Sequence, residues 1–315
     1  ILAHSKGNSA KMFIDKFGNH WYKGNLHTHT TLSDGKLSPD DTKRFYRSQG
    51  YDFLALTDHW IYGEGSESDE SGLLILSGTE YNFNDEDTVR GVFHIVGVGM
   101  TDDPMKKIGR ESTTQETIDE ILACGGAAIL AHPAWSLNTC EMLMDFEHIT
   151  ALEIFNSVSD LPRNCRPYSG IVVDQLASRG IYHKLVATDD THFYLGEEAR
   201  SYIYVNLYDK PFNRENLVAA IIAGEYIATQ GPIFTTRVDG GEYVVECGAD
   251  SNVVGVVFFT NRPWENQRSV MSDGTKPLTE ARFPIHKNDR FVRAELYTQD
   301  RKTGWSQITP LKAEN

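Results

Sequence analysis

The chain has 315 residues, a length that suits one large α/β domain plus a smaller one. Hydrophobic residues make up 40% and charged residues 23%, as expected for a globular protein with a substantial core. Thirty basic against 44 acidic residues give a formal net charge of −14, so we expect neither a duplex nucleic acid nor an anionic membrane as partner. A small anionic substrate held by metal ions remains compatible with this charge, because bound cations dominate the local field.

The first part of the chain alternates short apolar runs with helical patterns. Near-continuous apolar runs separated by helices indicate an α/β fold with a parallel sheet covered on both faces. The predicted strands are Gly24–Thr28, Phe53–Thr57, Leu73–Gly78, Phe93–Gly97, Ala127–Ala131, Ala151–Phe155 and Lys184–Ala187.

Three helices have start and stop signals among these strands. A residue that can cap a helix N-terminus opens each of them, and a glycine suited to a helix C-terminus closes each. The opening and closing residues are Ser38 and Gly50, Thr113 and Gly125, and Asn213 and Gly224.

From about Gln230 the pattern changes to strands alone. The segment TTRVDGGEYVVEC has the signature of a hairpin, with Asp239-Gly240-Gly241 as its turn. Further strand-like segments, VGVVFFT and FVRAELYTQD, follow with no helical pattern between them. We therefore predict an α/β unit over residues 12–232 and a small β-sandwich over residues 233–315 that supplies no metal ligand.

The cysteines and the hydropathy pattern bear on the compartment. None of Cys124, Cys140, Cys165 and Cys247 stands in a Cys-x-x-Cys pair, which argues against thiolate zinc sites and thioredoxin-like chemistry. Their wide spacing favours reduced thiols and a cytoplasmic location. No apolar run is long enough to span a membrane.

Histidines and carboxylates recur at or beside the predicted strands. His27 and His29 are two residues apart, so on a strand both imidazoles point to one face and can bind the same ion. Parallel α/β barrels carry their chemistry at the C-terminal ends of strands, so side chains placed there converge. We expect one metal site to be built from His27, His29, Asp34, His59, Glu80, His94, His132, Asp190 and His192.

These residues stand in motifs that resemble the PHP (polymerase and histidinol phosphatase) superfamily over roughly residues 24–232. The motifs are His27-x-His29 with Asp34, Thr57-Asp58-His59, Glu80, His94, Ala131-His132-Pro133 and Asp190-x-His192. The resemblance implies a distorted seven-stranded (β/α)7 barrel, similar to a TIM barrel, with a trinuclear centre of zinc, manganese or iron. A further likeness, in NLVAAIIAGEYIATQGP and FVRAELYTQDRKTGWSQI, is to a branch that includes carbamate- and ester-cleaving metallohydrolases.

The resemblance also implies how two or three divalent ions would be shared. Glu80 would bridge the first two ions, and either Asp189 or Asp190 could be the acidic ligand near the end of the set, with the Asp-x-His spacing favouring Asp190. The first ion would be held by His27, His29, Glu80 and Asp190, the second by Glu80, His94 and His132, and the third by Asp34, His59 and His192.

A metal-dependent phosphoesterase is the leading hypothesis for function. Clustered cations lower the pKa of a bridging water, supply hydroxide and polarise phosphoryl oxygens. Asp34, Glu80 and Asp190 are the carboxylates expected to take part in catalysis, one of them as a proton shuttle. Two alternatives stay open: a metallohydrolase of carboxylic esters or carbamates, and a metal-stabilised binding module.

Residues outside the metal set are candidates for binding a small phosphoester or ester substrate. Asn156 ends a predicted strand without being a metal ligand, and Arg163, Arg166 and Arg200 can bind anions by bidentate hydrogen bonds. The amidohydrolase superfamily also opens with His-x-His, but its binuclear form needs a lysine where this chain reads FHIVGVG.

Overall fold

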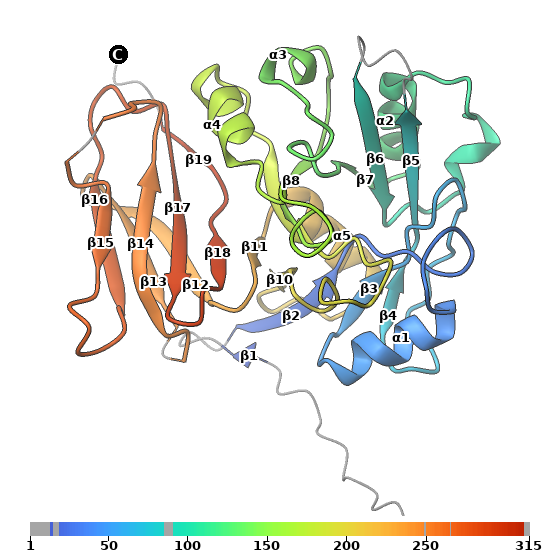
Figure 1. Ribbon diagram of the computed structural model, residues 1–315, viewed down its shortest axis with the longest axis horizontal. Helices are drawn as coiled ribbons and strands as arrows, with labels where there is room; N and C mark the ends of the chain where they lie inside the picture. Colours follow the sequence, from blue (N-terminus) through green and yellow to red (C-terminus); the bar gives the residue numbers. More distant parts are fainter. Residues whose placement is uncertain (1–12, 15–18, 85–90, 249, 265, 312–315) are drawn as a thin grey trace, which may run out of the picture.

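The computed structural model describes residues 13–14, 19–84, 91–248, 250–264 and 266–311. Strands dominate it, and five α-helices lie among the described residues (Figure 1). The helices are α1 (Pro39–Ser48), α2 (Thr114–Ala123), α3 (Cys140–Leu143), α4 (Gly170–Ser178) and α5 (Arg214–Ala223).

The predicted starts of three helices are confirmed. Ser38 accepts a hydrogen bond from the Asp41 backbone at the start of α1, and Asn213 does the same for Asn216 at the start of α5. Thr113 and Glu116 form the reciprocal capping box of α2. Short polar side chains therefore determine these starts locally. The helices α3 and α4 have no counterpart in the sequence prediction.

Two open sheets form the part of the fold that precedes the C-terminal strands. A five-stranded sheet runs in the order β5-β6-β7-β8-β9, and a larger sheet contains β11-β10-β2-β3-β4, with β1 paired to β2. The bounds are β1 (Phe13–Ile14), β2 (His20–Asn25), β3 (Phe53–Ala55), β4 (Leu74–Leu76), β5 (Gly78–Asn84), β6 (Val92–Val98), β7 (Ala127–Leu130), β8 (Ala151–Asn156), β9 (Lys184–Thr188), β10 (Tyr202–Asn206) and β11 (Tyr226–Thr229).

This topology corrects the prediction of a parallel sheet closed into a (β/α)7 barrel. β5 pairs antiparallel with β6, and β6 antiparallel with β7, whereas β7, β8 and β9 are parallel. β9 lies against β10 and β11 without a hydrogen-bonded ladder, so the strands do not close into a ring in the described part of the chain. Consecutive strands that pair antiparallel, as β5 and β6 do, need no crossover helix between them, whereas parallel strands do.

An apolar core fills the space between the two sheets. Val96 and Val98 of β6 meet Leu74 and Leu76 of β4, and α5 closes the core with Leu217. His94 points to the same side of β6 as Val96, since alternate residues of a strand share a face. The histidine therefore stands at the end of a packed apolar layer that fixes its height.

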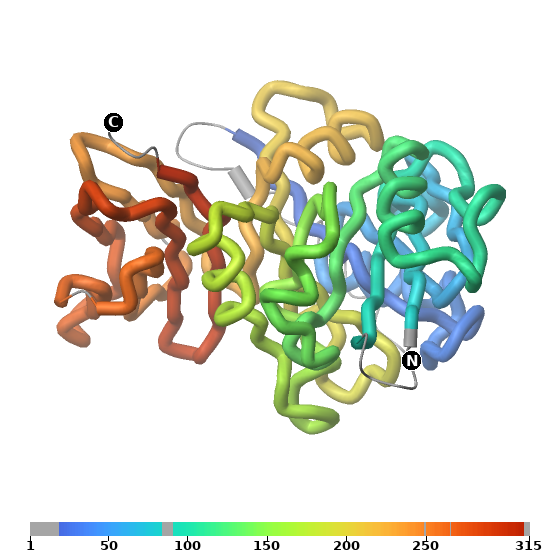
Figure 2. The backbone as a smooth tube through the Cα atoms, turned by 90° about the horizontal axis from the view of Figure 1, so that it is seen from above, coloured from blue at the N-terminus to red at the C-terminus, as the bar shows by residue number. Residues whose placement is uncertain are grey.

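The C-terminal strands form two further layers at one end of the molecule, drawn in orange and red (Figures 1 and 2). A three-stranded sheet, β12-β13-β16, shares a core with β15-β14-β17, and this core includes Phe234, Tyr243 and Phe258. β18 pairs with both β17 and β11, so the large sheet runs on from one unit into the other. The bounds are β12 (Phe234–Asp239), β13 (Glu242–Cys247), β14 (Val253–Phe259), β15 (Ser269–Met271), β16 (Glu280–Pro284), β17 (Phe291–Thr298), β18 (Thr303–Trp305) and β19 (Thr309–Pro310).

The predicted hairpin is confirmed as β12 and β13. Gly240 and Gly241 form its turn with φ of 59° and 85°, in the left-handed region that glycine adopts without strain. No helix among the described residues is long and apolar enough to cross a membrane.

Candidate metal centre

The structure brings all nine predicted ligands together at one end of the two sheets. His27 and His29 lie just past β2, where the extended chain makes a parallel bridge between Thr28 and Thr191. The Asp190 backbone N–H donates to His27 O at 2.9 Å, and the His29 N–H donates to Thr191 O at 3.0 Å. This local pairing places Asp190 and His192 beside the His-x-His segment. The nine side chains fall into three groups of potential ligands.

The first group is fully buried and consists of His27, His29, Glu80 and Asp190. The Nε2 atoms of His27 and His29 are 3.2 Å apart. Each lies 3.1–3.3 Å from Glu80 Oε2 and from Asp190 Oδ1. Ligand atoms about 2.1 Å from a single ion lie roughly 3.0–3.4 Å apart in octahedral or tetrahedral coordination, so these spacings suit one metal ion.

The donor set itself fits a cation. His27 Nδ1 donates to Glu153 Oε1 at 2.7 Å, so its Nε2 presents a lone pair to the two carboxylates. Asp190 Oδ1 is buried and has no hydrogen-bond partner among the described residues. Several buried acceptors thus meet where only positive charge can satisfy them.

The pKa shifts in the group have the same electrostatic cause. Burial by itself lowers the pKa of His27, but Asp190, Glu80 and Glu153 raise it well above its ordinary value. Burial raises the pKa of Glu80, yet His27 and His94 hold it well below its usual range. The cluster therefore favours positive charge between its carboxylates, carried either by protons or by metal ions.

The second group joins the first through Glu80. One carboxylate oxygen, Oε2, faces His27 and His29, and the other, Oε1, lies 2.9 Å from His94 Nδ1 and 3.5 Å from His132 Nε2. His132 Nδ1 is within 3.0 Å of Ser136 Oγ, which orients the ring. A carboxylate with its two oxygens in two groups has the geometry of a bridging ligand.

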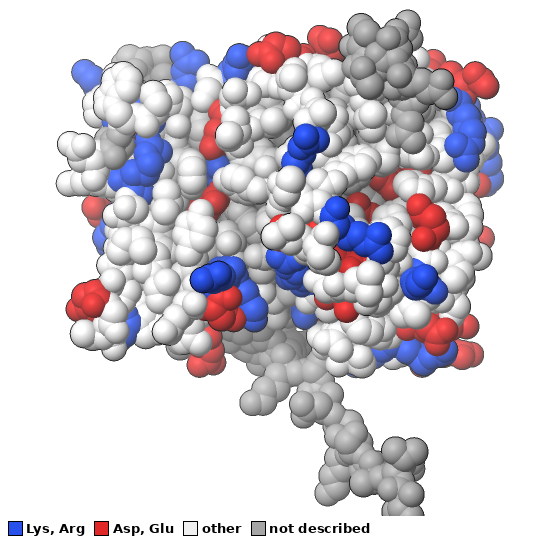
Figure 3. Space-filling model, in the orientation of Figure 1, with Lys and Arg blue, Asp and Glu red and all other residues white. Residues whose placement is uncertain are grey.

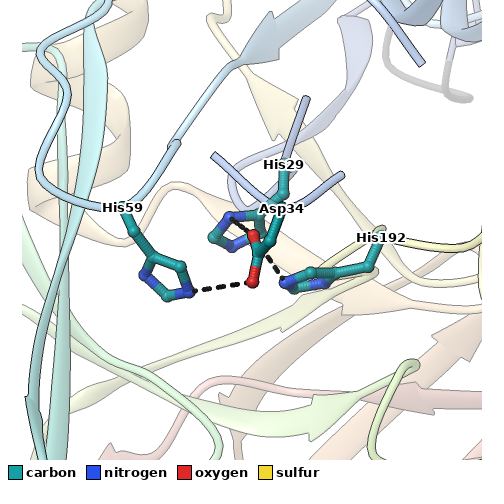
Figure 4. Close-up of side chains that lie close together, drawn as sticks. All are labelled: His29, Asp34, His59 and His192. Atoms are coloured by element: carbon teal, nitrogen blue, oxygen red, sulfur yellow. Dashed lines mark ion pairs between the residues drawn. The ribbon is translucent and has the colours of Figure 1, made fainter. Parts of the chain in front are cut away.

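The third group lies nearest to solvent and is shown in Figure 4. The Asp34 carboxylate is 3.4 Å from His192 Nε2, 3.5 Å from His29 Nδ1 and 3.7 Å from His59 Nε2. His192 donates from Nδ1 to the Asp190 carbonyl at 2.7 Å, so its Nε2 lone pair is directed at this group. Asp34 is 55% exposed, unlike the buried carboxylates of the other two groups.

Two of the potential ligands and a neighbour of a third have a strained backbone. His132 and Asp190 adopt φ of 32° and 53°, a region that non-glycine residues rarely occupy, and Trp60 beside His59 has a φ of 53°. Such conformations persist only where the surrounding structure enforces them, and they cluster at functional sites.

Two supporting carboxylates lie outside the predicted set. Glu153 on β8 is fully buried and accepts from His27, from the His132 backbone and from Thr188 and Asn156 at 2.6–2.7 Å. Glu153 is the single acidic residue of the apolar segment ALEIF, and this was the sequence signal for its role in the site.

Asp58 is the other supporting carboxylate. It accepts from the backbone and hydroxyl of both Thr30 and Ser33 at 2.6–3.1 Å, and so fixes the loop that carries Asp34. Its place in the Thr57-Asp58-His59 motif was a usable signal.

Asp189 and Asp190 point in opposite directions. The Asp189 carboxylate accepts from Tyr46 and from the backbone of Arg200 and Ser201, away from the histidines. Burial raises its pKa to about 7. Of the two residues, only Asp190 belongs to a ligand group.

A cavity of about 290 Å³ opens onto the three groups. Arg163 lines it, and its guanidinium lies 3.4 Å from the centre of the Phe193 ring. Asn156 is instead fully buried and donates to Asp190 Oδ2 at 3.1 Å, and Arg200 pairs with Asp160 outside the cavity. Arg166 is exposed and is not part of the lining.

Comparison with known proteins was made for both sequence and structure. No family model matches the chain. A 5′-3′ exoribonuclease of Haemophilus influenzae is 39% identical over 80 residues, which are 24% of this chain and 28% of that protein. The chain therefore spans only about a quarter of the length of this relative.

Among solved structures, the similarity to one protein extends over the whole chain. A two-domain protein from Bacteroides vulgatus containing a "predicted PHP-like metal-dependent phosphoesterase" matches with a TM-score of 0.56 and 13% identity, covering 98% of this chain and 99% of that one. An amidohydrolase from Chromobacterium violaceum matches with a TM-score of 0.41 and 16% identity over 55% of this chain and 88% of that one. The chain has the fold of this two-domain protein, and that fold agrees with the resemblance to the PHP superfamily seen in the sequence motifs.

Proposed function

We propose that the protein is a hydrolase that uses two or three divalent transition-metal ions, zinc, manganese or iron, to cleave a phosphoester. One observation carries the proposal: in a buried site the Nε2 atoms of His27 and His29 lie 3.2 Å apart, and each lies 3.1–3.3 Å from Glu80 Oε2 and from Asp190 Oδ1. The whole-chain likeness to a PHP-like protein supports it at the level of the fold.

Bound ions would lower the pKa of water, polarise phosphoryl oxygens and neutralise charge on the leaving oxygen. The chain's own residues hold this arrangement in place. Glu80 offers one oxygen to each of two groups, and Glu153 keeps the proton of His27 on Nδ1. Asp34 is the half-exposed carboxylate of the three groups, so solvent reaches it.

Arg163 is the proposed contact for the substrate anion. Its guanidinium faces the cavity and has no carboxylate partner among the described residues, whereas Arg200 is paired with Asp160. A stacked guanidinium retains free N–H groups for bidentate binding of phosphate. Asn156 and Arg200, also predicted to bind substrate, are better explained as groups that position Asp190 and the loop around Asp160.

Surface charge is consistent with a small substrate. On the face drawn in Figure 3, basic and acidic side chains are interspersed and no extended basic area is present. The exoribonuclease relative nevertheless makes a short oligoribonucleotide a necessary member of any substrate panel.

The proposal is tested by comparing an aryl phosphate with the matching aryl acetate at equal manganese, zinc or iron loading. We expect turnover of the phosphate, lost with a chelator and restored by metal, and rising towards neutral pH as the bound water ionises. A large, chelator-sensitive preference for the acetate would instead identify an ester or carbamate hydrolase. Metal binding without turnover of any ester or oligoribonucleotide would identify a binding module.

A further inference from the structure

The loops around the cavity expose leucines that the rest of the chain keeps inside. Leu32, Leu137, Leu161 and Leu195, here called the apolar rim, are 56%, 62%, 69% and 60% exposed. Every other leucine in the described part of the chain is buried or half-buried. Other large apolar residues, such as Ile171 and Trp264, are exposed singly elsewhere, as is common on protein surfaces, whereas the exposed leucines all lie on loops next to the cavity.

Each rim leucine belongs to a different loop of the metal centre. Each lies two residues along the chain from a residue that lines the cavity, so their Cα atoms are at most about 7.6 Å apart. The pairs are Leu32 with Asp34, Leu137 with Trp135, Leu161 with Arg163, and Leu195 with Phe193. The apolar rim therefore lies on loops that also contribute to the wall of the cavity.

Two of the rim leucines, Leu195 and Leu137, lie in segments with a constrained backbone. The Leu195 and Tyr194 N–H groups donate to the Glu197 carboxylate at 2.9 and 2.7 Å. Leu137 has a φ of 58°, a strained conformation for a bulky residue. The backbone at these two leucines is therefore fixed by local contacts, while their side chains stay in contact with water, which is unfavourable for an apolar group.

The loop that carries Leu161 makes a tight turn at this residue. The N–H groups of Arg163 and Asn164 both donate to Asp160 O, at 3.1 and 2.9 Å, across the leucine. Arg163, two residues further on, faces the cavity with its guanidinium stacked on Phe193. One short loop thus presents an anion-binding group inwards and an apolar group at the mouth.

We propose that the apolar rim binds the organic part of the substrate, which is a phosphoester of an apolar alcohol or phenol. The proposal rests on the proposed phosphoesterase function. The cavity of about 290 Å³ takes the phosphoryl group between the metal ligands and Arg163, and the alkyl or aryl group lies across the rim. In the reaction the water oxygen bonds to phosphorus, the ester P–O bond breaks, and the released alcohol takes a proton from that water.

The first test is a series of ethyl, butyl, hexyl and octyl phosphates, each below its micelle concentration, with the manganese-loaded protein. Burial of one methylene stabilises binding by up to about fourfold, so kcat/KM is expected to rise with chain length by up to this factor per methylene. Glycerol phosphate, similar in size to the smaller members but polar, should be the poorest substrate. A flat series, or a preference for glycerol phosphate, would overturn the inference while leaving phosphoester hydrolysis intact.

The second test removes part of the rim with the double variant Leu161→Ser and Leu195→Ser. We expect the slope of kcat/KM against chain length to fall by at least half. Met271→Ser is the matched control, because Met271 is 63% exposed on β15 in the C-terminal unit, and it should keep the wild-type slope. Equal slopes in the double variant and the control would contradict the inference.

A binding measurement separates this inference from the proposed function. Octylphosphonate and methylphosphonate cannot be hydrolysed, and calorimetry should show octylphosphonate binding at least tenfold more tightly with a negative heat-capacity change. If no phosphoester is turned over, the proposed function fails, and this ratio alone decides whether the rim binds apolar groups: equal affinities would refute it.

Two other occupants of the rim are distinguishable outcomes. If the chain is a dimer that the double variant makes monomeric, the rim binds a second copy of the chain. If wild-type protein sediments with phosphatidylcholine vesicles and the double variant does not, the rim binds a lipid surface. Either result would overturn the substrate assignment.

Discussion

At the scale of single residues, Glu80 is the most heavily used side chain of the metal centre. Its carboxylate oxygens lie within 2.9–3.5 Å of ring nitrogens of His27, His29, His59, His94 and His132. Glutamine would place an NH₂ donor where one of the two groups needs an acceptor, and it would remove the negative charge that both groups share. His59, by contrast, belongs to the third group alone.

We therefore expect Glu80→Gln and His59→Ala to differ in how much metal the protein retains. If each of the three groups holds one ion, His59→Ala should lose the ion of its own group, and Glu80→Gln should lose those of the two groups that share it. The metal-to-protein ratio after gel filtration, measured by mass spectrometry, checks this. His183→Ala is the control and should retain all the metal. His183 lies just before β9, and its ring is hydrogen-bonded to the Ile149 carbonyl. Loss of every ion from His59→Ala would refute the partition.

At the scale of elements, the loop from Thr30 to Gly35 has no regular secondary structure, yet hydrogen bonds fix its conformation. Asp58 accepts four hydrogen bonds from Thr30 and Ser33, and the Gly35 N–H closes the loop on Thr30 O at 2.8 Å. A Cβ on Gly35 would lie 2.4 Å from the His29 backbone, so only glycine fits. Asp34 is therefore held by its neighbours and not by a helix or strand.

Asp58→Asn should loosen this loop and weaken metal binding in the third group alone. Removing an outer-shell partner of a metal site commonly lowers metal affinity by about 10–100-fold, and we expect a loss of that size. Zinc titration by calorimetry measures it. Asp289→Asn is the control, since Asp289 is also a buried carboxylate that accepts a backbone N–H, from His286, but lies in the C-terminal unit. An unchanged titration for Asp58→Asn would show that the loop holds its shape without this carboxylate.

At the scale of the whole molecule, the C-terminal unit is built into the α/β unit through β18. Trp305 at its end is 1% exposed, stacks on Phe155 of β8 at 5.2 Å and belongs to the core beneath the five-stranded sheet. Arg293 of β17 is fully buried and pairs with Asp174 of α4. The proposed division at residues 232 and 233 thus separates two units that share a sheet and a core.

Trp305→Ala should destabilise both units together. Truncating a buried tryptophan costs about 3–5 kcal/mol, and we expect a loss of this size in one cooperative urea transition followed by circular dichroism. Trp264→Ala is the control, because Trp264 is 78% exposed and its removal should change stability by less than about 0.5 kcal/mol. Two separate transitions would show that the units fold independently.

The sequence by itself determined the features that depend on neighbours along the chain. The His27-x-His29 spacing puts two rings on one face of any extended segment, and the caps at Ser38, Thr113 and Asn213 begin helices through bonds that span three residues. The hairpin turn at Gly240 and Gly241 likewise depends on adjacent residues of the chain. The nine potential ligands could be named because each stands beside an apolar run.

Only the tertiary structure decided what these local pieces contact. β5 pairs antiparallel with β6, and the sheets stay open, although the near-continuous apolar runs had favoured a parallel sheet. Such runs show that a strand is buried on both faces, and that burial occurs here with an antiparallel partner. Glu153 and Asn156 are both polar residues of one apolar strand segment, yet one orients His27 and the other Asp190. Their roles depend on residues more than thirty positions away, and such contacts are fixed by packing and burial of the whole fold rather than by spacing along the chain.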